Sequence, residues 1–278
     1  MSIRKTGIVF QRFGKQFKVF VENQTLVAFA QKKLQWKRDF KLLVGDKVTL
    51  ENGVIVAVEE RKNTLVRPKV VNVDQVVIVQ SLIEPKINWQ QLFKLLIHFH
   101  AQNVARLVLV ITKNDLEFEP AEKARLSELT SFGYQLFFTA PNADLPLTLF
   151  TELQNRFSVF MGQSGVGKSS LINRLDSQIH QAIQALSAHQ FGKNTTTSTV
   201  MFPFQNGFIC DTPGFNVIDF PNLKQLAAQH FVGFASLIGQ CHFSNCTHQS
   251  EKGCFIVSAV TQKSYSLWLY ESYLKLIN

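Results

Sequence analysis

One eight-residue string limits what this chain can fold into more than any other part of the sequence. It follows the apolar run 157–161 and precedes residues 170–175, which have the spacing of a helix. A buried strand should therefore turn into a helix at this point, which is the context of a phosphate-binding loop. The string has the form Gly-x4-Gly-Lys-Ser and consists of Gly162, Gln163, Ser164, Gly165, Val166, Gly167, Lys168 and Ser169.

The residue types of this loop suit an anion held at close range. Glycines let backbone N–H groups approach the anion, and the N-terminus of the following helix adds partial positive charge at the same point. We expect Lys168 to reach the terminal phosphates and the hydroxyl of Ser169 to ligate Mg²⁺. The predicted nucleotide-binding residues are the whole string and Ser170 behind it.

The composition indicates the kind of protein that carries this loop. A chain of 278 residues with 46% hydrophobic residues can build two or three packed domains. The N-terminus does not resemble a signal peptide, and the longest apolar stretch, near 104–111, is too short to span a bilayer. We therefore expect a cytoplasmic protein that does not contact a membrane, and we expect it to be a monomer.

The net charge of +9 is concentrated at one end of the chain. Residues 1–69 contain 15 Lys+Arg and 6 Asp+Glu, whereas residues 70–278 balance to zero. A solvated basic face is the simpler explanation, but a separate basic domain is typical of contact with an anionic polymer. We predict that this domain contacts nucleic acid.

Residues 1–68 alternate as strands do. Phe17, Val19 and Val21 share one face, and Asn52-Gly53 lies between two apolar runs as a hairpin turn. Several short strands in about 65 residues predict a small closed barrel of the oligonucleotide-binding type. Several side chains of this segment could stack bases or bind phosphates, and the aromatic ones suit a core equally well. They are Phe13, Lys32, Lys33, Trp36, Lys37 and Arg38.

Residues 69–220 show strands alternating with helices. This pattern predicts a doubly wound α/β domain with a parallel sheet. The predicted elements are buried strands at 76–79 and 104–111, helical spacing over 92–99, a helix from Pro120 to Gly133, a strand at 134–139 and a strand at 207–210.

A candidate base-reading motif comes before the phosphate loop. Thr112-Lys113-Asn114-Asp115 follows the strand that ends at Ile111. The Asp115 carboxylate could accept hydrogen bonds from the ring N–H and the exocyclic amine of guanine, and adenine has no matching pair of donors. Lys113 could lie across the base, and the next strand end, Thr139-Ala140, could offer a backbone N–H. The sequence thus predicts GTP and GDP as ligands.

Two further motifs follow the phosphate loop. Asp211-Thr212-Pro213-Gly214 has the Asp-x-x-Gly form that positions Mg²⁺ and senses the γ-phosphate. One hydroxyl of the run 195–197 should complete the metal shell, and we choose Thr196. The predicted catalytic residues are Lys168, Thr196, Asp211 and Gly214, with Ser169 and Thr196 as protein ligands of Mg²⁺.

The four motifs occur in a circularly permuted order relative to ordinary GTPases. In this order, with a basic barrel before them and a cysteine-rich segment after them, the chain resembles the circularly permuted, small-ribosomal-subunit-dependent GTPases of ribosome biogenesis over nearly its whole length. The resemblance implies slow GTP hydrolysis stimulated by the small (30S) subunit. It also implies contact with the rRNA of that subunit and a role in its late maturation.

Two positions depart from the pattern of that family. Members commonly have His where this chain has Asn194, and Asn where it has Thr112. Asp115 should keep guanine selection, but Asn194 removes any proton handling by the His. One alternative is therefore a GTP-dependent RNA-binding scaffold with negligible turnover. Another is a zinc-dependent nucleic-acid module with a P-loop ATPase.

Residues 221–278 contain a pattern through which the resembled family binds zinc, Cys-x4-Cys-x-His-x5-Cys. Three thiolates and one imidazole can close a tetrahedral shell, so we expect one structural Zn²⁺ per chain. His242 is a possible competing ligand, and Cys210 lies in a predicted strand as a core residue. Helices are predicted at 223–238 and 265–276. The predicted zinc ligands are Cys241, Cys246, His248 and Cys254.

Overall fold

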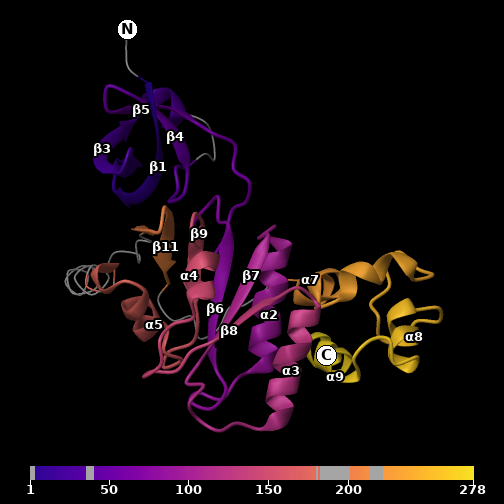
Figure 1. The fold of residues 1–278 in the computed structure, drawn as a ribbon. Helices are drawn as coiled ribbons and strands as arrows, with labels where there is room; N and C mark the ends of the chain where they lie inside the picture. The colour runs from indigo at the N-terminus through magenta and orange to yellow at the C-terminus, as the bar shows by residue number, and fades with distance from the viewer. Residues whose placement is uncertain (1–3, 36–40, 180, 182–200, 213–221) are drawn as a thin grey trace. The chain divides into compact units, whose positions relative to one another are not determined.

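The computed structural model describes residues 4–35, 41–179, 181, 201–212 and 222–278. The chain divides into two compact units. Figure 1 shows its helices and strands, coloured from the N-terminus to the C-terminus. The first comprises residues 1–77, 145–161 and 167–214, and the second comprises 78–144, 162–166 and 215–278. Among the described residues, no helix is both long enough and apolar enough to cross a membrane.

The N-terminal residues form the predicted closed barrel, with strand order β1-β2-β3-β5-β4. The inward positions of β2, Phe17, Val19 and Val21, are all buried in its core. Asn52 and Gly53 make the predicted hairpin turn with φ of 49° and 76°. The elements are β1 (Arg4–Phe13), β2 (Gln16–Val21), β3 (Gln24–Ala30), α1 (Lys32–Gln35), β4 (Lys47–Glu51) and β5 (Val54–Val58).

The α/β region contains a six-stranded sheet with the order β10-β11-β9-β6-β7-β8. β7 and β8 are parallel, as are β9 and β11. The predicted parallel sheet has one antiparallel strand at its edge that was not predicted, because the two-residue turn Gln205-Asn206 folds β10 back against β11. The strands are β6 (Gln75–Ser81), β7 (Arg106–Thr112), β8 (Gln135–Phe138), β9 (Phe157–Met161), β10 (Met201–Phe204) and β11 (Gly207–Asp211).

The predicted helices of this region are present. The apolar face of α2 is buried as its spacing indicates, and Asn88 caps its N-terminus by accepting a hydrogen bond from the N–H of Gln91 at 3.0 Å. α3 begins at Pro120 and ends before Gly133, which has a φ of 89°. The helices are α2 (Trp89–Ala101), α3 (Pro120–Ser131), α4 (Leu147–Leu153) and α5 (Lys168–Leu175).

The C-terminal residues are helical, but the prediction of one helix over 223–238 is wrong. α7 stops at His230 because Phe231 turns to an extended conformation and buries its ring 5.1 Å from Phe93 and 5.4 Å from Tyr273. Gly233, at a φ of 75°, then continues the turn. The elements are α7 (Leu223–His230), η1 (Phe234–Ser236), η2 (Ile238–Gln240), α8 (Phe255–Thr261), which was not predicted, and α9 (Leu267–Ile277).

Candidate functional site

The phosphate loop lies between β9 and α5, as predicted. Every residue of β9 is buried, and α5 starts at Lys168. Gly165 and Gly167 have φ of 84° and 89°, which other residues rarely adopt. A Cβ on Gly162 would lie 2.7 Å from the carbonyl oxygen of Val79, so no larger residue fits there. The backbone therefore requires glycine at all three positions.

Lys168 and Asp211 meet at the carboxyl ends of two neighbouring strands. β9 and β11 are parallel, and their ends bring Lys168 and Asp211 together. The ammonium group of Lys168 is buried and contacts the Asp211 carboxylate and the backbone carbonyl of Thr212, the latter at 2.6 Å. The Thr212 hydroxyl in turn donates to the carbonyl of Phe160 at 2.8 Å. This geometry supplies a cation for phosphate oxygens beside an oxygen donor suited to Mg²⁺.

The base motif sits at the end of β7 and contacts the phosphate loop directly. Thr112 is 7% exposed, and its hydroxyl contacts the carbonyls of Gln80, at 3.1 Å, and Val166. Val166 immediately precedes Gly167 and Lys168 in the chain. The hydroxyl of the first residue of the motif is thus bonded to the phosphate loop.

The remaining residues of the motif form one turn with the end of β8. The N–H of Asn114 donates to the carbonyl of Thr139 at 3.1 Å, and the N–H of Thr139 donates to Ile111 at 2.8 Å. The structure therefore brings Thr139 and Ala140 beside the base motif, as predicted. Asp115 is exposed, and its carboxylate has no hydrogen-bond partner in the described part of the chain, so it is open to a ligand.

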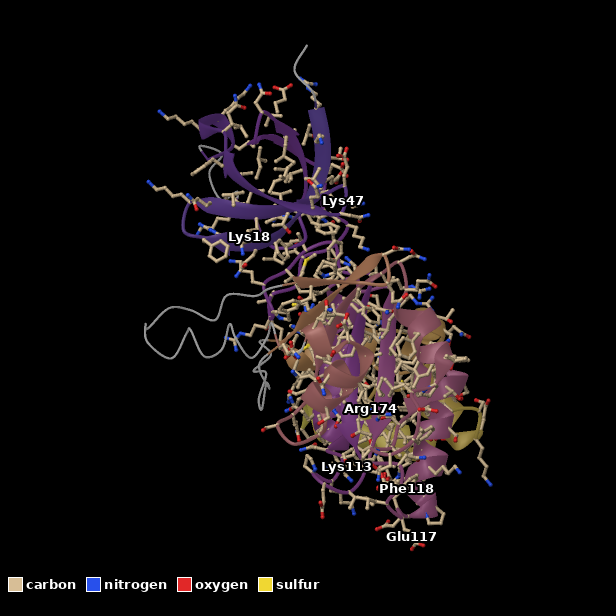
Figure 2. The ribbon with its side chains drawn as sticks, turned by 60° about the vertical axis from the view of Figure 1, so that its left-hand side comes forward. Lys18, Lys47, Lys113, Glu117, Phe118 and Arg174 are labelled. Atoms are coloured by element: carbon tan, nitrogen blue, oxygen red, sulfur yellow. The ribbon has the colours of Figure 1, made fainter. Side chains whose placement is uncertain are left out.

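A neighbouring segment was missed from the sequence. Lys113, labelled in Figure 2, has a φ of 56° and contacts the carbonyl of Glu84 through its Nζ. The turn after β6 is fixed by Ser81, whose hydroxyl accepts from the N–H of Glu84 at 3.2 Å. The sequence did contain a signal for this contact, because Glu84-Pro85 directly follows a buried strand. The carboxyl ends of parallel strands share one edge of a sheet, so Glu84 could be expected near Lys113.

The zinc pattern converges on one point of the C-terminal region. The ligand atoms of Cys241, Cys246, His248 and Cys254 all lie within 4.8 Å of one another. The Nδ1 of His248 is 3.6 Å from the sulfur of Cys241 and 3.7 Å from that of Cys254. Three sulfurs and one nitrogen at these separations fit a tetrahedral Zn²⁺ with no open position. Cys210 is buried in β11, away from this cluster in the sequence.

Binding of Zn²⁺ to this cluster would displace protons from its thiols. Burial raises the pKa of Cys246 to about 12 and also raises the pKa of Cys254, while burial lowers the pKa of His248. Without a positive charge these thiols therefore stay protonated. Zn²⁺ would stabilise the thiolates and accept the neutral imidazole.

Glu251 organises the loop that carries His248. Burial opposes its ionisation, but hydrogen bonds led by those from Thr247 lower the pKa of Glu251 to about 2. Its carboxylate accepts from the N–H and hydroxyl of Thr247 at 2.5 and 2.6 Å, and from the N–H groups of Gln249 and Ser250 at 2.9 and 3.1 Å. Tyr270 on α9 donates to the carbonyl of His248 at 3.0 Å. The loop is thus held from both sides around its ligand.

Several predicted residues fall outside the described part of the chain. In the GTPase region these are Thr196 and Gly214, together with Asn194 and the position after the Asp-x-x-Gly motif, Phe215. In the barrel, the candidate RNA-contacting residues Trp36, Lys37 and Arg38 also lie outside it. Ser169 and Ser170 are described and exposed at the start of α5. Of the predicted catalytic set, the structure therefore places Lys168 and Asp211.

A phosphate loop, a facing aspartate and an upstream base motif on a P-loop GTPase-like sheet define a circularly permuted GTPase. A family model described as RsgA GTPase matches residues 58–221. The chain belongs to the RsgA GTPase family and is a GTP-hydrolysing enzyme.

The relatives and solved structures support this membership over the whole chain. The small ribosomal subunit biogenesis GTPase RsgA of Mycoplasma genitalium is 60% identical over 272 residues, which cover 98% of each chain. The RsgA of Shouchella clausii is 35% identical over 254 residues, which cover 87% of this chain and 86% of the relative. The crystal structure of YjeQ from Thermotoga maritima matches with a TM-score of 0.80 and 28% identity, covering 99% and 98%. The crystal structure of YloQ, a circularly permuted GTPase, matches with a TM-score of 0.79 and 25% identity, covering 99% of this chain and 94% of YloQ.

Proposed function

We propose that this GTPase acts in late maturation of the small (30S) ribosomal subunit. The observation that carries the proposal is the 60% identity to a small ribosomal subunit biogenesis GTPase across 98% of both chains. The basic N-terminal barrel adds a physical reason, since residues 1–69 hold the whole excess of positive charge. The protein works in the cytoplasm as a monomer and contacts the rRNA of the subunit.

The proposed nucleotide site has a base side and a phosphate side. Asp115 reads guanine, supported by its exposed carboxylate and by the turn that holds Asn114 against Thr139. Lys168 binds the terminal phosphates, and Ser169, Thr196 and Asp211 organise Mg²⁺. When bound, Mg²⁺ neutralises charge that develops on the phosphate oxygens.

The proposed division of labour follows three segments of the chain. Residues 1–68 contact RNA, residues 69–220 bind and hydrolyse GTP, and residues 221–278 hold one structural Zn²⁺. The support for the last part is that four ligand atoms, all from loop residues, converge within 4.8 Å of one another. Four protein ligands fill a tetrahedral Zn²⁺ shell and leave no open coordination position.

Hydrolysis by the isolated protein should be slow. The residue directly after the Asp-x-x-Gly motif is Phe215, which can neither donate nor accept a hydrogen bond to orient the attacking water. The small subunit supplies or repositions the missing group, and such completion of a phosphoryl-transfer site can raise the rate by about 10³–10⁵. Binding to the subunit should therefore raise kcat much more than it changes the KM for GTP.

Single-turnover hydrolysis with and without saturating small subunits tests this function. We expect strong stimulation with GTP and none with ATP, and GDP binding that ATP does not displace. Tight GTP-dependent binding to subunits with no hydrolysis would favour the scaffold alternative. Equal rates with and without subunits would refute the stimulation mechanism.

A further inference from the structure

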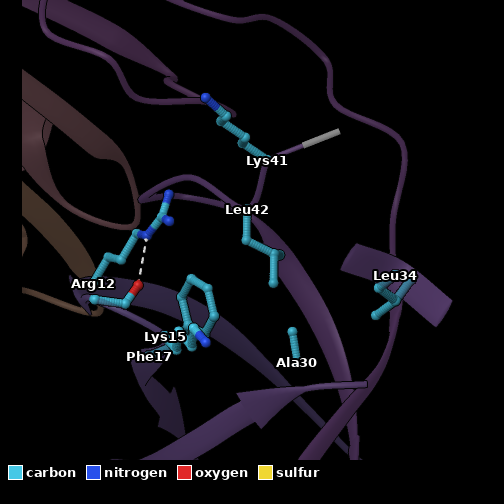
Figure 3. Close-up of a pocket in the computed structure, with 8 residues that line it drawn as sticks. Arg12, Lys15, Phe17, Ala30, Leu34, Lys41 and Leu42 are labelled. Atoms are coloured by element: carbon cyan, nitrogen blue, oxygen red, sulfur yellow. Dashed lines mark hydrogen bonds between the residues drawn. The ribbon is translucent and has the colours of Figure 1, made fainter. Parts of the chain in front are cut away.

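The barrel contains a pocket with an apolar floor, drawn in Figure 3. Its volume is about 210 Å³. Phe17, Ala30 and Leu42 belong to the barrel core and are 6 to 8% exposed, and Leu34 of α1 packs against that core. Figure 3 shows these four side chains around one space. Because the floor offers carbon surface and one aromatic ring, it suits a flat ligand with apolar faces.

The rim of the pocket is cationic. Arg12, Lys15 and Lys41 line it, and none of the lining residues in the described part of the chain is a carboxylate. Within the described residues Lys15 and Lys41 form no ion pair, whereas Arg4 and Lys5 on the same barrel pair with Glu51 and Glu22. The rim therefore retains positive charge that an anion can neutralise.

Arg12 connects the rim to the floor. Its guanidinium carbon lies 5.8 Å from the ring centroid of Phe17, and its Nε donates to the carbonyl of Gly14 at 3.1 Å. That hydrogen bond holds Arg12 over the turn between β1 and β2. A Cβ on Gly14 would meet no atom within 4 Å, so there is open space beside this turn at the edge of the pocket.

We infer that this pocket binds one unstacked base of single-stranded RNA, with the adjoining phosphates on Arg12, Lys15 and Lys41. An apolar floor beneath a cationic rim matches a nucleotide, whose base has two apolar faces and whose backbone is anionic. Bases inside a duplex are stacked and cannot enter. The inference rests on the proposed function, which brings rRNA to the barrel, and it adds that the barrel prefers an unpaired strand.

The test compares the full-length, zinc-loaded protein on two probes by fluorescence anisotropy. One probe is a labelled single-stranded oligoribonucleotide of about 10 nucleotides, and the other is its duplex with the complementary strand. Leu34→Trp fills the pocket without changing charge. Its matched control is Val27→Trp, which adds the same ring at an exposed site on β3 outside the pocket.

A second pair of variants covers the case in which Leu34→Trp fails to fold. Lys15→Gln removes one rim charge, and Lys47→Gln removes one charge from β4, outside this pocket; Lys47 is labelled in Figure 2. Thermal unfolding checks that each variant is folded. Small-subunit binding is measured in parallel.

We expect the wild-type chain to prefer the single strand, and Leu34→Trp to weaken that binding about tenfold or more while duplex binding stays unchanged. Lys15→Gln should lower the preference for the single strand over the duplex. It should also reduce the magnitude of the slope of log K against log salt concentration by about 0.7. Both control variants should keep the wild-type preference. If subunit binding is normal but Leu34→Trp and Lys15→Gln do not change the affinity for the single strand, the pocket inference is wrong while the proposed function stands. A wild-type chain that binds neither subunits nor RNA would overturn the proposed function itself.

Discussion

The hydroxyl of Thr112 contacts the backbone carbonyl of Val166, so the base motif and the phosphate loop share a buried hydrogen bond. Thr112→Val keeps the shape of the side chain but removes the donor, and an unpaired buried carbonyl costs about 1–3 kcal/mol. We expect GDP affinity to fall about tenfold, measured by fluorescent GDP titration.

Thr112→Ser is the control for this prediction, because it keeps the hydroxyl. Thr112→Asn, which also supplies a donor, should recover part of the loss. If Thr112→Val binds GDP as tightly as the wild-type chain, the contact does not hold the loop.

The exposed carboxylate of Asp115 should control base choice. Asp115→Asn replaces one of two acceptors by a donor, and a hydrogen bond to a charged group is worth about 1.5–3 kcal/mol. We expect GTP affinity to fall about 10- to 100-fold and the preference over ATP to shrink, measured by nucleotide competition. Asp144→Asn, at another exposed aspartate, should change neither. An unchanged preference in Asp115→Asn would remove this residue from the base site.

Lys168→Ala should eliminate hydrolysis, because the charge facing the phosphates is lost. We expect single-turnover rates to fall at least about 100-fold. The half-buried Asp211 carboxylate would also lose its cation, so the melting temperature should drop in the absence of nucleotide. Lys123→Ala, at an exposed lysine of α3, is the matched control. Normal turnover in Lys168→Ala would contradict the phosphate-loop assignment.

Zinc should co-purify at one ion per chain. Cys246→Ser opens the closed shell, so we expect metal content to fall and hydrogen exchange to rise first in α9, which Tyr270 ties to the ligand loop. His242→Ala should keep the metal, because His242 is not part of the converging cluster. Elemental analysis of reduced, chelator-free protein decides the point, and a chain without zinc would refute the site.

The packing of α2 and α7 should weaken in acid. Burial, and secondly the nearby His230, lower the pKa of His100 from 6.5, and burial lowers the pKa of His230. A lowered folded-state pKa contributes stability that is complete above pH 6.5 and is lost as pH falls through the folded-state value. We expect the melting temperature to drop between about pH 7.5 and pH 5.5.

His100→Gln provides the comparison, since Gln cannot titrate but can still bond the Tyr134 hydroxyl, which lies 3.0 Å from His100. The pH dependence of its melting temperature should be shallower over the same range. An equal slope in both proteins would show that His100 does not cause the effect.

The sequence alone determined the elements and motifs that depend on local patterns. Alternation predicted the barrel strands, the loop at 162–169 predicted its own strand-to-helix setting, and the spacing of four soft ligands predicted the zinc cluster. Each of these signals lies within a short stretch of chain, where backbone geometry and side-chain periodicity are directly related.

Only the tertiary structure decided which distant groups meet. α7 ends at His230, where Phe231 packs on Phe93, more than a hundred residues away, and the local stop signal, Gly233, comes only two residues after Phe231. In the same way, Thr112 contacts Val166 and Lys113 contacts Glu84 across the ends of separate strands. These contacts depend on strand order and on burial of shared surface, which local periodicity does not encode.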